Sequence, residues 1–230
     1  TTAAFIGEGN IAKTLDETIA LRVKFLTEYQ DSAYAEQYKT FVEKVRSAEA
    51  RHVPGKSGLS EATAKYLFKL MAYKDEYEVA RLYTTGDFEK RIKETFDGDF
   101  RINFNLAPPM FSKRDANGHL VKQQYGPWVF KAFKLLAKMK GLRGGSFDIF
   151  GKTEERKMER QLIVEYRNTL EELIDGLNPG NHELAVDIAK VPEHIRGYGH
   201  VKEAHFEKAK ARRDDLLLQW RHPEPDRAVA

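Results

Sequence analysis

The chain has no cysteine among its 230 residues. Disulfides, thiolate nucleophiles and cysteine-bound zinc or iron–sulfur clusters are therefore excluded within it. The lack of cysteine fits a reducing compartment, and we expect a cytoplasmic protein. No apolar run approaches the roughly 20 residues of a membrane-spanning helix, so we expect no membrane partner. A signal-peptide pattern is missing and Thr1 stands where Met would, so we expect a trimmed product or a piece of a longer polypeptide.

A large excess of charge of one sign is also missing, because 38 basic residues face 35 acidic ones and the formal net charge is +3. This balance gives no support to a nucleic-acid binder, although it allows local basic patches. A charged fraction of 32% beside a hydrophobic fraction of 41% is typical of amphipathic helices. A chain of this length can bury a substantial core.

Apolar residues recur at helical spacing along most of the chain. Thr14 and Glu17 have the spacing of a capping box, in which two side chains satisfy free backbone N–H groups at a helix start. The first two helices are expected to form an antiparallel hairpin. Helices are predicted from about residues 14 to 26, 31 to 52, 60 to 86, 87 to 96, 127 to 140, 153 to 177, 181 to 190 and 200 to 220.

One segment alternates apolar and polar residues instead: residues 100–106 read FRINFNL, which is typical of a strand. Pro108 and Pro109 end it, and an Asn-Gly turn follows at residues 117–118. One or two strands cannot build a sheet-based fold. We therefore predict a mainly α, multi-helix domain with a small β-strand or hairpin element near residues 99–122.

We expect residues 1–230 to form a single accessory domain with a flexible tail at residues 221–230. Its possible sub-units are a helical part at residues 10–98, a β or loop insert at 99–126 and a second helical part at 127–220.

The stretch IRGYGHVKEAH, residues 195–205, holds two of the seven histidines. His205 follows His200 by five residues and so points away from it on a helix, whereas a helical metal pair has a spacing of four. The chain's one Glu-x-x-His run, Glu49 to His52, lies at a frayed helix end. We predict no metal site and no catalytic residue.

The glycines of this stretch, Gly197 and Gly199, can take positive φ angles or permit close backbone approach. Two interpretations stay open: a tight joint between helices, or a contact surface for an anion or a neighbouring domain. The candidate contact residues here are Arg196, Tyr198, His200 and Lys202.

Three further segments have two interpretations each. GLRGG, residues 141–145, could hold an anion through Arg143 or could simply end a helix. Lys131, Lys134 and Lys138 could dock an acidic partner or form an ordinary solvated helix face. YKDEYE, residues 73–78, could serve acid–base chemistry if buried, but ordinary pairs along a helix are favoured.

Five longer strings occur in a fixed order: LFKLMAYKDEYEVARLY, FNLAPPMF, YGPWVFKAFKLLAKMKGLRGGSFDIFG, TEERKMERQLIVEY and VPEHIRGYGHVKEAH. They resemble the C-terminal region of the large, fused-chain indolepyruvate ferredoxin oxidoreductases, members of the 2-oxoacid:ferredoxin oxidoreductase family. The resemblance runs from about residue 15 to residue 220.

The resemblance implies a parent enzyme that oxidatively decarboxylates aryl or branched-chain 2-oxoacids. Such an enzyme uses thiamine diphosphate with Mg²⁺, [4Fe-4S] clusters, coenzyme A as co-substrate and ferredoxin as acceptor. This chain lacks the Gly-Asp-Gly signature of thiamine diphosphate sites and any Cys-x-x-Cys run, so we expect none of these cofactors within it.

The expected role is therefore a non-catalytic accessory domain. It would pack on the catalytic domains of the same polypeptide or form the subunit interface of a homo-oligomer. The alternative is a binding module that docks acidic ferredoxin on the lysine face or holds the phosphates of coenzyme A near residues 196–202.

Overall fold

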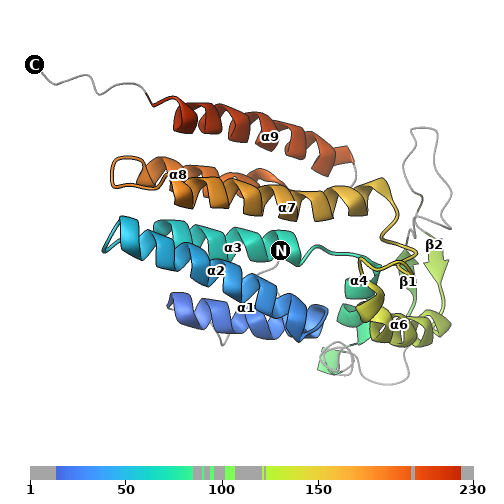
Figure 1. The fold of residues 1–230 in the computed structure, drawn as a ribbon. Coiled ribbons are helices and arrows are strands. Elements are labelled where there is room, and N and C mark those ends of the chain that lie inside the picture. Colours follow the sequence, from blue (N-terminus) through green and yellow to red (C-terminus); the bar gives the residue numbers. More distant parts are fainter. Residues whose placement is uncertain are drawn as a thin grey trace, which may run out of the picture. The chain divides into compact units, whose positions relative to one another are not determined.

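The structure, a computed structural model, describes residues 14–84, 90, 94–95, 102–106, 121, 123–197 and 200–223 (Figure 1). Its contacts divide the chain into two compact units. Unit 1 comprises residues 1–73 and 152–230, and unit 2 comprises residues 74–151. The division therefore falls at other points than the predicted sub-unit boundaries at residues 98 and 126.

Unit 1 is a stack of helices (Figure 1). Its N-terminal helices α1 and α2 pack on each other as predicted, α2 packs on α3, and α3 packs on α7 and α8. The last helix, α9, lies against α8 and the short 3₁₀ helix η3. The bounds are α1 Leu15–Tyr29, α2 Ser32–His52, α3 Gly58–Met71, α7 Glu154–Asp175, α8 His182–Lys190, η3 Val191–His194 and α9 His200–Arg221.

Side-chain caps determine where several of these helices begin. The capping box is confirmed, because the hydroxyl of Thr14 accepts from the backbone N–H of Glu17 while Glu17 accepts from the backbone N–H of Thr14. Single side-chain caps begin two other helices: Asp31 accepts from the backbone N–H of Tyr34 in α2, and Thr153 accepts from that of Arg156 in α7. Each of these cap residues bonds to a backbone group only three residues away, so the starts of these helices can be predicted from the sequence.

The core of unit 1 combines aliphatic side chains with tyrosines whose hydroxyl groups reach backbone carbonyls. Tyr38 donates to the carbonyl of Ala64 at 3.0 Å, and Tyr166 donates to that of Ala189 at 2.8 Å. Each buried ring thus contributes apolar area without leaving its polar end unpaired. Leu26, Leu59, Leu67, Leu170 and Leu173 are fully buried around them.

A buried carboxylate, that of Glu49 on α2, joins three helices of this unit. It accepts hydrogen bonds from the backbone N–H groups of Leu59 and Ser60, both at 2.8 Å, and from the hydroxyl of Ser60. These N–H groups belong to the first turn of α3, whose N-cap residue Ser57 makes no side-chain cap. The Nε2–H of His182, the first residue of α8, donates to the same carboxylate at 2.7 Å.

Burial alone raises the pKa of Glu49, yet its hydrogen bonds from Ser60, His182 and the backbone of Leu59 outweigh burial and lower it. The carboxylate is 1% exposed, whereas His52 lies at the exposed end of α2. The Glu-x-x-His run therefore places one buried and one exposed side chain on α2, and the two do not form a common site.

The predicted single helix from residue 60 to residue 86 is wrong, because the chain breaks between α3 and α4 (Glu76–Thr84). Asp75 caps α4 by accepting from the backbone N–H of Glu78 at 2.8 Å. The carbonyl of Tyr73, inside the break, accepts from the hydroxyl of Tyr29 on α1 at 2.8 Å. This break also separates unit 1 from unit 2.

Unit 2 contains α4, the strands β1 (Phe104–Leu106) and β2 (Gln123–Tyr125), α6 (Trp128–Lys138) and the 3₁₀ helix η2 (Met139–Leu142). The strands pair antiparallel, with Phe104 opposite Tyr125. The predicted mainly α fold with a small hairpin is confirmed, although β2 lies just beyond residue 122. Tyr83 of α4, Phe104 of β1 and Phe133 of α6 contact one another with ring centroids 5.3–5.6 Å apart and so join the three elements.

The substitution Glu49→Gln tests the carboxylate that joins α2, α3 and α8. It keeps the shape but places an amide N–H₂ against groups that are themselves donors, so we expect the free energy of unfolding to fall by about 3 kcal/mol in urea at neutral pH. The pKa of Glu49 is lower in the folded chain, so its contribution is present above the usual value of 4.5 and is lost as pH falls toward the folded pKa. The gap between wild type and variant should therefore narrow in acid.

A matched control is Glu36→Gln on the exposed side of α2. It should change the unfolding free energy by less than about 0.5 kcal/mol. Equal unfolding midpoints for Glu49→Gln and Glu36→Gln would contradict the structural role of Glu49.

Candidate functional site

A basic hollow of about 510 Å³ lies on unit 1 between η3 and α9. Its volume falls in the range of small-molecule sites. None of its lining residues is acidic, and all but one carry a basic side chain: His194, Arg196, His205, Lys208, Ala209 and Arg212. We refer to these six residues as the basic hollow.

One face of α9 supplies four of the lining residues. His205, Lys208 and Arg212 are spaced by three and four residues, so their side chains leave the helix on the same side. Ala209 lies among them and is 2% exposed. Its short side chain adds little bulk between the longer basic side chains of this face.

The opposite wall is the chain that leaves η3. Lys69 on α3 donates to the carbonyls of Pro192 and Glu193 at 2.7 and 3.1 Å and so holds the end of η3. The ring of His205 donates from Nδ1 to the carbonyl of Arg196 at 2.7 Å, because a carbonyl can only accept. His205 therefore carries its proton on Nδ1, which leaves Nε2 for another partner. Gly197 then turns the chain with a φ of 95°.

Burial of Lys69 and the positive charge of Arg196 beside it lower the pKa of Lys69 to about 8. The nearby Glu193 acts in the opposite direction but does not balance these effects. Lys69 is thus a partly buried amine beside a cluster of positive charge.

The basic residues of α9 fall into two groups. Those that face α7 have carboxylate partners: Lys202 pairs with Glu159, Arg213 with Glu165 at 2.8 Å, and Arg221 with Glu172 at 2.6 Å. Lys208 and Arg212 face the hollow, and within the described residues no carboxylate pairs with either. The hollow therefore has two basic side chains of α9 for which the described residues provide no carboxylate; Lys210, which lines another cavity, is a third such residue on this helix.

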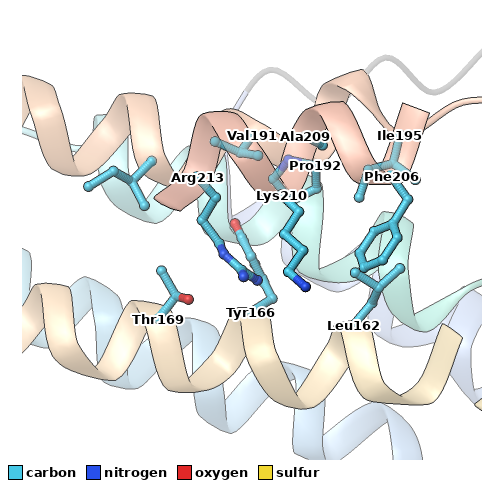
Figure 2. A pocket seen from close by; sticks show the side chains of 11 residues that line it. Leu162, Tyr166, Thr169, Val191, Pro192, Ile195, Phe206, Ala209, Lys210 and Arg213 are labelled. Carbon is cyan, nitrogen blue, oxygen red and sulfur yellow. The ribbon is translucent and has the colours of Figure 1, made fainter. Parts of the chain in front are cut away.

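A second, smaller cavity lies on the other side of Ala209, between α7 and α9 (Figure 2). Figure 2 shows Lys210 and Arg213 extending from α9 toward Tyr166 and Thr169 of α7. The cavity has a volume of about 30 Å³, which suits a water molecule and not a substrate. We regard it as a packing feature.

Of the contact residues predicted in the stretch 195–205, the structure places one in the basic hollow and another in an ion pair with α7. Arg196 lines the hollow, whereas Lys202 is engaged with Glu159 of α7. His200 begins α9, but its side chain lies outside the described residues, as does Tyr198. His194, His205, Lys208 and Arg212 were not predicted as contact residues. Lys208 and Arg212 are charges on a helix, a pattern that usually belongs to a solvated face.

In unit 2, Arg143 is 6% exposed and its guanidinium is held by Asp75. The distances are 2.5 Å from Nε to Oδ2 and 2.9 Å from Nη2 to Oδ1, so the pair is bidentate. Tyr77 lies beside the pair and donates to Asp148 at 3.2 Å, while Asp148 also accepts from the backbone of Gly144 and Gly151. Burial and the charge of Asp148 raise the pKa of Tyr77. This buried network closes the glycine-rich loop onto the start of α4.

The outer face of α6 carries both apolar and basic side chains. Trp128 and Leu135 are 62% and 64% exposed, and Met139 at the helix end is 39% exposed. Of the residues in α6, only Val129 is buried. The sequence pattern places Val129 in the same apolar stripe as Trp128, Leu135 and Met139. Lys131, Lys134 and Lys138 are exposed along one edge of the stripe. We refer to Trp128, Leu135, Met139 and these lysines as the α6 face.

The described part of the chain contains no group of three or more histidine, aspartate or glutamate side chains that could hold a metal ion. Among the same residues, no helix is both long enough and apolar enough to cross a membrane.

A family model matches residues 15–215, and the family is described as one of unknown function (DUF6537). No curated protein and no solved structure matches the chain.

The substitution Lys69→Met tests the buried amine that holds the end of η3. Because the pKa of Lys69 falls from 10.5 to about 8 on folding, the unfolded chain binds more protons between these values. The contribution of Lys69 to the unfolding free energy is therefore least favourable below pH 8 and rises as pH increases toward 10.5. Urea unfolding at about pH 7.5 and about pH 9.5 should show the wild type gaining stability relative to the variant.

Lys39→Met, at an exposed position of α2, serves as the control. It should keep the same stability difference from the wild type at both pH values. A pH-independent difference for Lys69→Met would refute the burial effect.

Proposed function

The chain belongs to this family, DUF6537, and we propose that it is a non-catalytic helical accessory domain of a thiamine-diphosphate-dependent 2-oxoacid:ferredoxin oxidoreductase. The support is the resemblance of five long strings to the indolepyruvate-oxidising members of that enzyme family. This resemblance and the DUF6537 match cover nearly the same residues, about 15–220 and 15–215. A cytoplasmic location is part of the proposal.

The cofactors of such an enzyme would be held outside this chain. A [4Fe-4S] cluster needs thiolate ligands, and the chain has no cysteine. The Gly-Asp-Gly signature of a thiamine diphosphate site is also missing from the sequence. The donor groups present here therefore do not fit either cofactor, and we assign no catalytic step to this chain.

The observation that carries the accessory role is the α6 face. Large apolar side chains rarely stand more than half exposed together unless a partner covers them, and Trp and Met are enriched at interfaces. Trp128 and Leu135 are such residues, on one side of one helix. The face therefore has the composition of an interface.

The lysines of the α6 face indicate the chemistry of the partner. Lys131, Lys134 and Lys138 line the apolar stripe and would be matched by carboxylates. We propose that the partner is an acidic-rimmed apolar surface on the catalytic part of the same oxidoreductase. Acidic ferredoxin is the second candidate, because the same lysines would favour it.

Docking can be followed through Trp128, one of two tryptophans in the chain. Replacing Trp220 by Phe leaves Trp128 as the sole reporter, and its fluorescence should shift to shorter wavelength when the catalytic part of a fused indolepyruvate ferredoxin oxidoreductase is added. Leu135→Asp should weaken this association by about tenfold or more, because it places a charge in the apolar contact.

Val164→Asp is the matched control, since Val164 is 51% exposed on α7 of the other unit. Equal weakening by both substitutions, or no spectral shift, would contradict docking through the α6 face. A shift with ferredoxin but not with the catalytic part would replace the accessory role by that of a ferredoxin-binding module. Thiamine-dependent turnover of a 2-oxoacid by the 230-residue chain alone would refute the non-catalytic assignment.

A further inference from the structure

We propose that the basic hollow is a binding site for a small molecule that carries a diphosphate group. The proposal concerns unit 1 and does not depend on docking through the α6 face. It rests on the shape of the hollow, the basic side chains that line it and the contacts that hold its η3 wall and His205 in place.

The first argument is the concentration of basic side chains. Three basic side chains, those of Arg196, Lys208 and Arg212, line one concave surface, although the basic and acidic residues of the chain as a whole are nearly balanced in number. Three other basic side chains of α9, those of Lys202, Arg213 and Arg221, pair with carboxylates of α7. Bringing like charges together costs free energy, and a polyanion in the hollow would recover it.

Arg196 is close to one carboxylate, that of Glu193, at 3.8 Å from Nη2. Glu193 has other partners, because a hydrogen bond from Tyr66 and the charge of Lys65 are the main causes that lower its pKa. The Arg196 side chain remains 68% exposed. Its guanidinium can therefore bind a phosphate without leaving a buried partner behind.

The second argument is that the hollow is held in shape from outside. Lys69 fixes the carbonyls of Pro192 and Glu193, and Arg196 itself donates from Nε to the carbonyl of Glu193 at 3.0 Å. The Nδ1–H of His205 binds the carbonyl of Arg196, so this ring ties α9 to the opposite wall. A preorganised site loses less conformational entropy when a ligand binds.

The residue types favour phosphate over other anions. Guanidinium groups bind two phosphate oxygens at once, and Lys208 adds a compact charge. Nε2 of His205 and the ring of His194 can donate to further oxygens when protonated. A hollow of about 510 Å³ with charges on two walls suits two linked phosphates better than one.

Inorganic pyrophosphate is the probe for a calorimetric titration of the 230-residue chain at about 50 mM salt. We expect saturable binding that weakens several-fold at about 200 mM salt, with orthophosphate binding more weakly. The double substitution Lys208→Gln and Arg212→Gln should weaken binding about tenfold or more. Lys210→Gln removes the same kind of charge from the same helix, but Lys210 lines the small cavity, so binding should change less than about twofold.

The ring signals of the histidines in NMR spectra give an independent readout that does not rely on variants. Pyrophosphate should shift the signals of His194 and His205 and leave those of His52, at the far end of α2, unchanged. Failure to shift either signal at concentrations up to about 10 mM would overturn the proposal. The proposal would also be overturned if Lys210→Gln weakened pyrophosphate binding as much as the double substitution of Lys208 and Arg212.

A single-stranded oligonucleotide separates a small ligand from a nucleic-acid backbone. We expect the oligonucleotide to bind no more tightly than pyrophosphate when both concentrations are expressed as phosphate groups. If the oligonucleotide shifts the same histidine signals at a concentration about tenfold lower than pyrophosphate does, the small-molecule assignment is refuted in favour of nucleic acid.

Discussion

The carboxylate of Glu49 is the interaction on which the arrangement of unit 1 depends. It satisfies the first backbone donors of α3 and holds the first residue of α8, so helices far apart in sequence share one buried group. Removing a carboxylate that binds several buried donors costs more than the loss of any single bond, because each donor is left without water. The helix that Glu49 holds at its first residue, α8, continues directly into η3, which forms part of one wall of the basic hollow.

Much of the helical fold can be predicted from the sequence, because caps and apolar periodicity are local signals. Thr14 with Glu17 illustrates this, since both members of the capping box lie within one turn. The break between α3 and α4 could not be predicted in the same way. Asp75 lies within a helical pattern, and its role as a cap is stabilised by Arg143, 68 residues away. The periodicity of α6 indicates an apolar stripe but not whether a core or a partner covers it.

The hollow was only partly accessible to sequence reasoning. The glycines and Arg196 mark an irregular joint, and that joint does form one wall. The other wall is a helix face whose charges resemble any solvated surface. What makes it concave is the position of η3, held by Lys69 from a point 123 residues earlier in the chain. Contacts of this range have no local signature.

The way in which α9 is held to α7 gives the hollow a particular sensitivity. Among the side chains of this helix that the structure describes, Ala209 and Leu217 alone are buried, and ion pairs between long side chains supply several of the other contacts with α7. Such pairs weaken as salt screens them, most of all the exposed pair of Arg221 and Glu172. Raising the ionic strength therefore has two effects on the basic hollow. It screens the attraction between the hollow and an anion in solution, and it weakens the ion pairs that hold α9, the helix that supplies most of the basic side chains of the hollow.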